Sequence, residues 1–378
     1  DHRDLHSFPT RRSSDLFNAG ALYEQALLSK DDALFTQVMR AWVHNYIELA
    51  LDYAHAGFYE EAVALLGAAP PVDPMVRYYT AWCHHQRAEI SQADTALKEA
   101  ALMPPDYCFP NQLEAIQALE LAVARNPQDG RAPYYLGNLW YAHRRYEEAI
   151  ACWEEATRRD ASFATPYRNL GLAYMNKRQD AARARQAYER AFALNPQDAR
   201  VFFELDQLYK KTAVAPAERL RLLKQHPQLV QRRDDLLLET ITLLNILGQS
   251  EEALQMLLGH VFHPWEGGEG KISEQYVLSL LALARADLAA ENWDHAREKL
   301  ERARSYPPNL NEGKLAGAQD NHIFYYLGLA HEGLRDRETA RACFEQAARG
   351  SVELSSAMYY NDQPPDMIFY QGLARQQL

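Results

Sequence analysis

The 378-residue sequence lacks the signatures of several common protein classes. Its four cysteines, Cys83, Cys108, Cys152 and Cys343, are widely and irregularly spaced and form no C-x2-C pair. This spacing indicates reduced thiols in a cytoplasmic protein rather than disulfides or a zinc site. There is no H-E-x-x-H motif, no nucleophile elbow and no dinucleotide-binding fingerprint. We therefore expect no metal and no cofactor, and we assign no catalytic residue; a non-enzymatic role is the favoured interpretation.

Long apolar runs and clusters of basic residues are also missing. No stretch approaches the roughly 18 consecutive apolar residues that a membrane-spanning helix requires. The formal net charge is −11, with 40 Lys and Arg against 51 Asp and Glu. Proteins that bind the phosphates of nucleic acids present clustered Lys and Arg instead. The sequence thus predicts neither a membrane nor a nucleic-acid partner.

What the chain does contain is a repeated helical pattern. Ala, Leu, Glu, Gln and Arg dominate and β-branched residues are sparse, which favours helix. Between Pro133 and Pro196, the pairs Leu136-Gly137 and Leu170-Gly171 stand 34 residues apart, and each is followed by a second apolar helical pattern. This period predicts repeated helix pairs, each packed on its neighbours.

The pattern resembles the tetratricopeptide repeat (TPR) signature, W-x2-L-G-x2-Y, A-x3-F and P. Weaker copies cover most of residues 46–348, and the match is strongest at 133–196 and 324–347. The resemblance implies an all-α, TPR-like α-solenoid, a right-handed superhelix of helix-turn-helix pairs. It also implies a concave face that binds peptides or protein segments.

A wider resemblance extends over nearly the whole chain after Leu16. It is carried by the segments F-H-P-W-E-G-G-E-G-K, N-E-G-K-L-A-G-A-Q-D-N and Y-Y-N-D-Q-P-P-D-M-I-F-Y-Q-G-L-A. With these segments the chain looks like the C-terminal helical region of uncharacterised bacterial proteins that carry a β-rich, sugar-enzyme-like domain before the repeats. The resemblance implies bacterial origin and a missing N-terminal domain, and it brings no established activity.

The chain is expected to have three parts. Residues 1–16 show no periodicity and resemble a translated sequencing adapter, so we expect an artificial, disordered extension. Because the natural N-terminus would then be absent, the question of an upstream signal peptide stays open. Residues 17–231 should hold TPR-like repeats, of which the third keeps only its second helix because Pro104 and Pro105 interrupt the first. Residues 232–378 should hold lengthened repeats with three inserts, and a capping helix from about Met367 to Gln377.

The three inserts span residues 262–271, 307–321 and 358–366, each after the second helix of a repeat. Ala253, Ala296 and Ala340 are spaced 43 and 44 residues apart, so the excess over 34 falls at the same place each time. Equivalent connections of a solenoid lie along one edge. We therefore expect the inserts to lie side by side and to form one surface.

The inserts combine aromatic residues with acids and amides, which suits an extended polar ligand such as a peptide or a sugar. The candidate binding residues are Trp265, Glu266, Glu269, Lys271, Asn311, Glu312, Gln319, Asp320, Asn321, Tyr360, Asn361, Asp362 and Gln363. One alternative is that these loops only pack on each other, with their polar groups bonded to loop backbone. Another is an acid and base pair, for example Glu266 with Glu269.

The sequence therefore predicts a non-enzymatic docking scaffold for a protein or peptide, such as the missing upstream domain. The alternative is the C-terminal half of a carbohydrate-active protein whose inserts help to bind an oligosaccharide.

Overall fold

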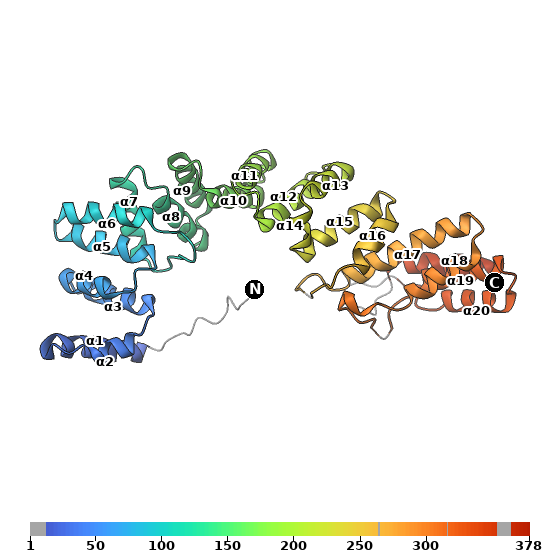
Figure 1. Cartoon of the computed structure of the whole chain (residues 1–378), viewed down its shortest axis with the longest axis horizontal. Helices are drawn as coiled ribbons and strands as arrows, with labels where there is room; N and C mark the ends of the chain where they lie inside the picture. Colours follow the sequence, from blue (N-terminus) through green and yellow to red (C-terminus); the bar gives the residue numbers. More distant parts are fainter. Residues whose placement is uncertain (1–12, 264, 316, 354–363) are drawn as a thin grey trace. The chain divides into compact units, whose positions relative to one another are not determined.

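The computed structural model describes residues 13–263, 265–315, 317–353 and 364–378. Throughout these residues the regular structure is helical, and no strand occurs among them (Figure 1). The helices follow one another as helix-turn-helix pairs, so the predicted all-α, TPR-like solenoid is confirmed. No helix of the described part is long and apolar enough to cross a membrane. The chain divides into two compact units, residues 1–195 and residues 196–378.

The first unit is a series of helix pairs with one single helix among them. Its elements are α1 (Ser13–Ser29), α2 (Ala33–Met39), α3 (Val43–His55), α4 (Tyr59–Ala68), α5 (Pro74–Gln86), α6 (Ile90–Leu102), α7 (Glu114–Arg125), α8 (Arg131–Ala142), α9 (Tyr146–Arg159), α10 (Ala164–Ala173), the π-helix η1 (Tyr174–Arg178) and α11 (Ala181–Leu194). As predicted, the third repeat keeps one helix, α7, which packs on α5 and α8. Helix α1 begins within residues 1–16; the artificial origin of that stretch stays a prediction.

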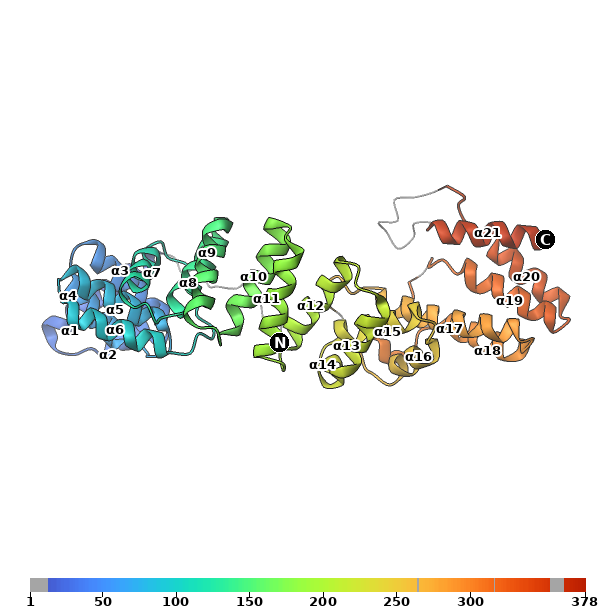
Figure 2. The ribbon, with the colours of Figure 1, turned by 90° about the horizontal axis from the view of Figure 1, so that it is seen from above.

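The second unit continues the pattern with longer connections. Its elements are α12 (Ala199–Lys211), α13 (Pro216–Gln225), α14 (Pro227–Gln231), α15 (Asp234–Ile246), α16 (Ser250–Leu258), α17 (Lys271–Ala289), α18 (Trp293–Ala303), the 3-10 turn η2 (Pro308–Leu310), α19 (Asn321–Gly333), α20 (Arg337–Ala347) and α21 (Pro365–Gln377). Helix α21 packs on α19 and α20, where the capping helix was expected (Figure 2). The sequence predicts that the repeats become longer from residue 232 onward. That boundary falls inside this unit and stays a prediction.

Most pairs share the same turn between their two helices and the same kind of residue where the second helix first packs on the first. The second residue before the second helix has a positive φ, between 54° and 86°: Gly57, Ala88, Arg144, Gln179, Gly248, Glu291 and Arg335. The fourth residue of that helix is an alanine at most 2% exposed: Ala62, Ala93, Ala149, Ala184, Ala253, Ala296 and Ala340. A side chain this small lets the two helices approach closely. The repeat is thus fixed by one left-handed residue and one buried alanine.

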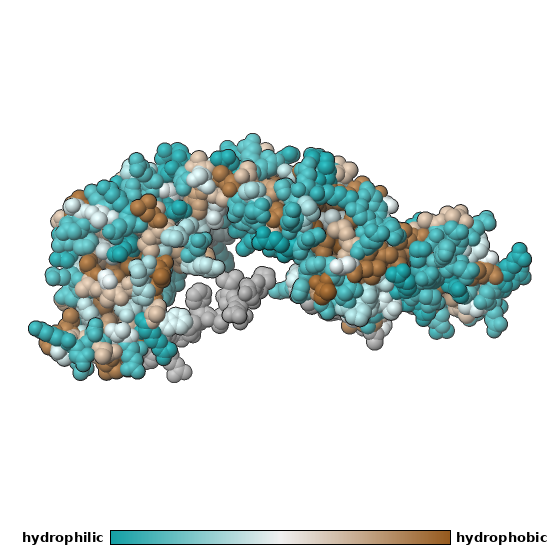
Figure 3. Space-filling view, viewed as in Figure 1, coloured by the Kyte–Doolittle hydropathy of each residue, from teal (hydrophilic) through white to brown (hydrophobic). Residues whose placement is uncertain are grey.

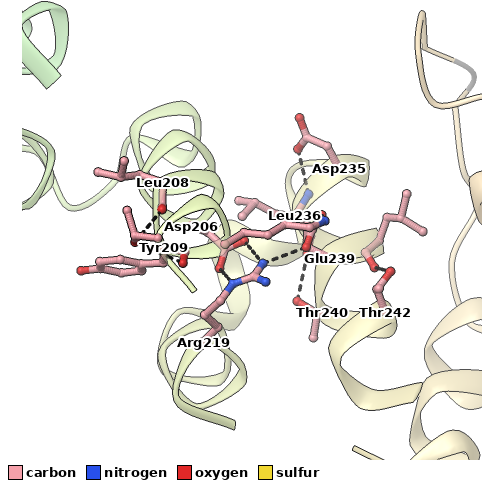
Figure 4. Close-up of polar contacts among 12 residues, drawn as sticks. Asp206, Leu208, Tyr209, Arg219, Asp235, Leu236, Glu239, Thr240 and Thr242 are labelled. Carbon is pink, nitrogen blue, oxygen red and sulfur yellow. Dashed lines mark hydrogen bonds and ion pairs between the residues drawn. The ribbon is translucent and has the colours of Figure 1, made fainter. Parts of the chain in front are cut away.

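The pair α12–α13 departs from this scheme. Its left-handed residue, Ala213, precedes the second helix by three positions instead of two. The fourth residue of α13 is Arg219 instead of an alanine, and its side chain is 5% exposed. Figure 4 shows this side chain reaching from α13 toward Asp206 on α12 and Glu239 on α15. An ion network therefore replaces the small apolar contact at this place.

Candidate functional site

The first two inserts lie side by side in the second unit. The backbone N–H of Phe262 donates to the carbonyl of Asn309 at 2.9 Å. The Asn309 amide donates in turn to the carbonyls of Leu257, at 2.8 Å, and His260, at 2.7 Å. The Asn311 amide reaches the carbonyl of Phe262 at 2.5 Å. These bonds confirm that the first two inserts are adjacent; residues 358–363 of the third lie outside the described residues.

The glycine-rich part of the first insert forms a tight turn before α17. The indole of Trp265 lies against Gly268, where a Cβ atom would come within 2.2 Å of the ring. Gly270, directly before α17, has a φ of 75°, in the region that favours glycine. The glycines thus serve the packing of Trp265 and the start of the helix.

Glu312 joins the second insert to the N-terminus of α17. Its two carboxylate oxygens accept from the backbone N–H groups of Gly270 and Ser273, both at 3.0 Å. An anion here also interacts favourably with the positive end of the helix dipole. Lys271 Nζ donates to the carbonyl of Gly267 at 2.5 Å. Two of the predicted binding residues therefore have structural partners at this turn.

A pocket of about 440 Å³ lies between the two inserts and the first turn of α17. Four of the predicted residues line it: Trp265, Glu269, Asn311 and Glu312. Its other walls are mainly apolar, and every charged side chain among the described residues that line it is a carboxylate. The further lining residues are Gly268, Gly270, Ile272, Ser273, Glu274, Tyr306, Leu310, Gly313, Leu315 and Ala318.

The remaining described candidates lie outside this pocket lining. Glu266 is exposed beside it, and the Gln319 amide donates to the Gly317 carbonyl at 3.3 Å. Asp320 is ion-paired with Lys314, with a shortest N–O distance of 2.6 Å. The structure therefore does not bring Glu266, Gln319 and Asp320 together with the four lining residues.

Asn321 is 4% exposed and also acts within the fold. Its amide donates to the carbonyls of Ala347, at 2.8 Å, and Arg349, at 2.7 Å, which ties the start of α19 to the end of α20. The last four candidates, Tyr360, Asn361, Asp362 and Gln363, lie outside the described residues. Their role in binding stays a prediction.

The sequence did not single out two residues that complete the pocket, Glu274 and Tyr306. Glu274 is exposed as a whole residue, yet desolvation of its carboxyl group and the negative charge of Asp366 together raise its pKa, against the opposing effect of Lys271. Burial, and next the charge of Asp320, raises the pKa of the Tyr306 hydroxyl. Glu274 lies within a helix and Tyr306 just before the second insert, so a search for unusual inserts passes over both.

A second pocket, of about 290 Å³, lies on the face of the second unit that the first helices of the pairs form. It is lined by Thr242, Asn245, Ile246, Ser250, Gln275, Leu278, Leu281, Ala282, Arg285, Tyr326 and Tyr370. We call it the first-helix groove. Two of its apolar side chains are strongly exposed: Ile246 at 62% and Leu278 at 43%. In the space-filling view, hydrophobic residues gather over α15–α17 (Figure 3).

Amides form the polar base of this groove. The Asn245 amide donates to the Gln275 side-chain oxygen at 3.1 Å, and Ser279 Oγ donates to the Asn245 oxygen at 3.0 Å. The guanidinium carbon of Arg285 lies 5.8 Å from the centre of the Tyr326 ring. The groove thus offers an apolar strip beside oriented amide groups and one cation.

Comparison with known proteins identifies the repeat type. Residues 137–178 match the family model described as TPR repeat. Similar solved structures include YrrB, "a TPR protein with an unusual peptide-binding site", at 18% identity and a TM-score of 0.35, covering 70% of this chain and 100% of that one. Another is PilF of Pseudomonas aeruginosa, at 22% identity and a TM-score of 0.34, covering 57% and 88%.

A third is a thermophilic TPR protein of Thermus thermophilus, at 18% identity and a TM-score of 0.31, covering 54% of this chain and 99% of that one. Likenesses at these TM-scores carry no inference about what this chain binds. The chain is an α-solenoid that contains a TPR repeat. The expected upstream sugar-enzyme-like domain stays a prediction.

Proposed function

We propose that this α-solenoid is a docking scaffold that binds an extended segment of a protein partner in the first-helix groove. The observation that carries the proposal is the exposure of Ile246 and Leu278 beside the amides of Asn245 and Gln275. Exposed apolar side chains that lie together and are rimmed by polar groups mark interaction sites in many proteins. We take the upstream domain that the sequence resemblance implies as the first partner to test.

The chemistry of the groove indicates which features the bound segment has. Its apolar side chains would cover Ile246 and Leu278, which removes apolar area from water at about 25 cal/mol per Å². Its backbone groups would bond to the amides of Asn245 and Gln275, because an amide side chain both donates and accepts. Arg285 favours an acidic side chain or a carboxylate at one end of the segment.

The proposal is tested by selecting binders from a random peptide display library on the full chain. Selected peptides should bind at least about tenfold more weakly to the Leu278→Glu variant, since a tenfold loss corresponds to about 1.4 kcal/mol. Leu258→Glu is the matched control, because Leu258 is similarly exposed, at 41%, but lies on a second helix, α16. Peptides that bind both variants as well as the unaltered chain would contradict the proposal.

The oligosaccharide alternative concerns the insert pocket and not this groove. It predicts saturable binding of an oligosaccharide that is lost in Trp265→Ala and unchanged in Leu278→Glu. Isothermal titration calorimetry with soluble oligosaccharides separates the two hypotheses.

A further inference from the structure

We propose that the pocket between the first two inserts binds an alkylammonium group, which is a primary amine at the end of an aliphatic stem. This site is separate from the first-helix groove, and the proposal does not depend on the docking function. The volume of the pocket, about 440 Å³, is in the size range of small-molecule sites.

The walls of the pocket suit the aliphatic stem. Leu310 is buried at its base, and Leu315, 49% exposed, lies at its edge. Trp265 and Tyr306 add two half-buried aromatic side chains. An aliphatic stem covered by these side chains leaves water. Lys314 Nζ already lies 5.7 Å from the centre of the Tyr306 ring, so Trp265 is the ring that we expect to attract a bound cation.

The charges of the pocket suit the amine. Glu269, Glu274 and Glu312 line it, and the part of the lining that the structure describes contains no Lys or Arg. Glu312 already accepts two backbone hydrogen bonds, so the carboxylates of Glu269 and Glu274 are the main partners for a ligand. Carboxylates near an apolar, partly desolvated surface attract an ammonium group more strongly than they would in bulk water.

Glu274 is the carboxyl group of the pocket whose ionisation a bound cation should change most. Desolvation raises its pKa, the charge of Asp366 adds to this, and Lys271 does not offset the two. A bound ammonium group would favour the ionised carboxylate and lower this pKa. Binding should therefore release a proton from Glu274, and it should strengthen as the pH rises through the raised pKa. The other titratable groups of the site are Glu269, Glu312 and Tyr306.

An alkylammonium group has two natural sources, a lysine side chain of a polypeptide and a free diamine or polyamine. The test is isothermal titration calorimetry on the full chain with two probes, N-acetyl-lysine-N-methylamide and 1,5-diaminopentane. Binding of either probe supports the site, and the tighter of the two identifies the source.

The decisive variant is Glu274→Gln. It should weaken the binding of the probes at least about tenfold and remove the strengthening that the unaltered chain shows as the pH rises above about 4.5, the ordinary pKa of a glutamate. Glu298→Gln is the matched control, since it makes the same change in charge at an exposed position on α18. Ala318→Trp, which fills the pocket without changing charge, should also abolish binding. Urea unfolding midpoints close to that of the unaltered chain establish that the variants are folded.

Three results would overturn the proposal. The first is that neither probe binds at millimolar concentration. The second is that Glu274→Gln and Glu298→Gln weaken binding equally, which would mean attraction to the overall negative charge of the chain. The third is that an oligosaccharide binds in a Trp265-dependent manner while the amines do not. Leu278→Glu should leave amine binding unchanged, so failure of this site and failure of the docking groove can be told apart.

Discussion

Two helix pairs of this solenoid solve the same packing problem in different ways. In α8–α9 the two helices meet through Gly137 on α8 and Ala149 on α9. Both residues are so small that the two backbones can approach closely. In α12–α13 the residue in the place of Ala149 is Arg219, and it faces Asp206. The first contact is apolar and close, whereas the second is ionic and directional.

The close contact in α8–α9 depends on an aromatic ring. A Cβ atom on Gly137 would lie 2.5 Å from Trp153 Nε1 and 3.1 Å from the Ala149 carbonyl. The indole is held in place, since Nε1 donates to the Asn138 side-chain oxygen at 3.1 Å. Gly171 with Tyr188 and Gly328 with Phe344 repeat the arrangement, with closest approaches of 2.5 Å and 2.4 Å. Glycine on one helix and a ring on the other therefore define the regular contact.

The ionic contact in α12–α13 involves a third helix. Arg219 donates to both oxygens of Asp206, at 2.9 Å and 2.6 Å, and to Glu239 on α15 at 2.8 Å. Lys210 adds a bond of 2.6 Å to Glu239. Asp206 and Arg219 are 4% and 5% exposed, so their charges are balanced chiefly by one another. The comparison shows that a buried ion pair can fix the geometry of three helices where small residues fix that of two.

The largest expected effect is that of Arg219→Ala. Removing one partner leaves Asp206 with an uncompensated buried charge, at a cost of about 3–5 kcal/mol. Hydrogen bonds from Lys210 and Arg219 outweigh burial and lower the pKa of Glu239, a stabilisation that is lost as the pH falls through that pKa. The deficit of the variant should therefore stay constant near neutral pH and shrink only as the pH falls below about 4.5, the ordinary pKa of a glutamate. Urea unfolding measures the loss, and hydrogen exchange locates it in α12–α15.

Two further variants sharpen this prediction. Arg221→Ala, on the exposed side of the same helix, should change stability by no more than about 0.5 kcal/mol. The double variant Asp206→Ala with Arg219→Met replaces the pair by apolar side chains and should regain most of the loss. If the double variant is as unstable as Arg219→Ala, uncompensated charge is not the cause.

The second prediction concerns the regular pair. Gly137→Ala would force its methyl group into the held indole of Trp153, and overpacking of this kind costs about 1–3 kcal/mol. Gly372 in α21 is the control, because no atom of the described residues beyond its own helix lies within 4 Å of its Cβ position. There the same substitution should stabilise by about 0.4–1 kcal/mol. Thermal unfolding followed by circular dichroism compares the two, and a harmless Gly137→Ala would contradict the close contact.

How far the sequence predicts these features depends on whether they repeat. The helix pairs could be predicted because glycine and alanine recur with the period of the repeat, and the single helix α7 because Pro104-Pro105 stops its partner. The ion network could not, since one extra turn residue after Ala213 moves Arg219 into the alanine position. A charged residue in a helix is normally expected in solvent, and nothing in the sequence gives its distance to Asp206 and Glu239.

The site was predictable in part for the same reason. The inserts stood out by their length, and four of their candidates do meet at one pocket. Glu274 and Tyr306 also line this pocket, but nothing in the sequence marks their positions as unusual. The first-helix groove was missed because Ile246 and Leu278 have the spacing of core residues, and only the structure shows their exposure.

The smallest expected effect is that of Glu312→Ala, which tests whether a charged link between repeats must be buried to matter. Like Arg219, Glu312 joins two segments, but it is partly exposed. In the variant, water can therefore bond to the two N–H groups that lose the carboxylate, and the cost is smaller than that of Arg219→Ala. Its loss leaves two backbone N–H groups at the start of α17 without a cap, which costs about 0.5–2 kcal/mol. The effect should be confined to faster hydrogen exchange at residues 265–275, while the exposed neighbour Glu266→Ala changes nothing there. A loss as large as that of Arg219→Ala would show that the two inserts depend on this cap for their fold, and that the contrast between buried and exposed links does not hold.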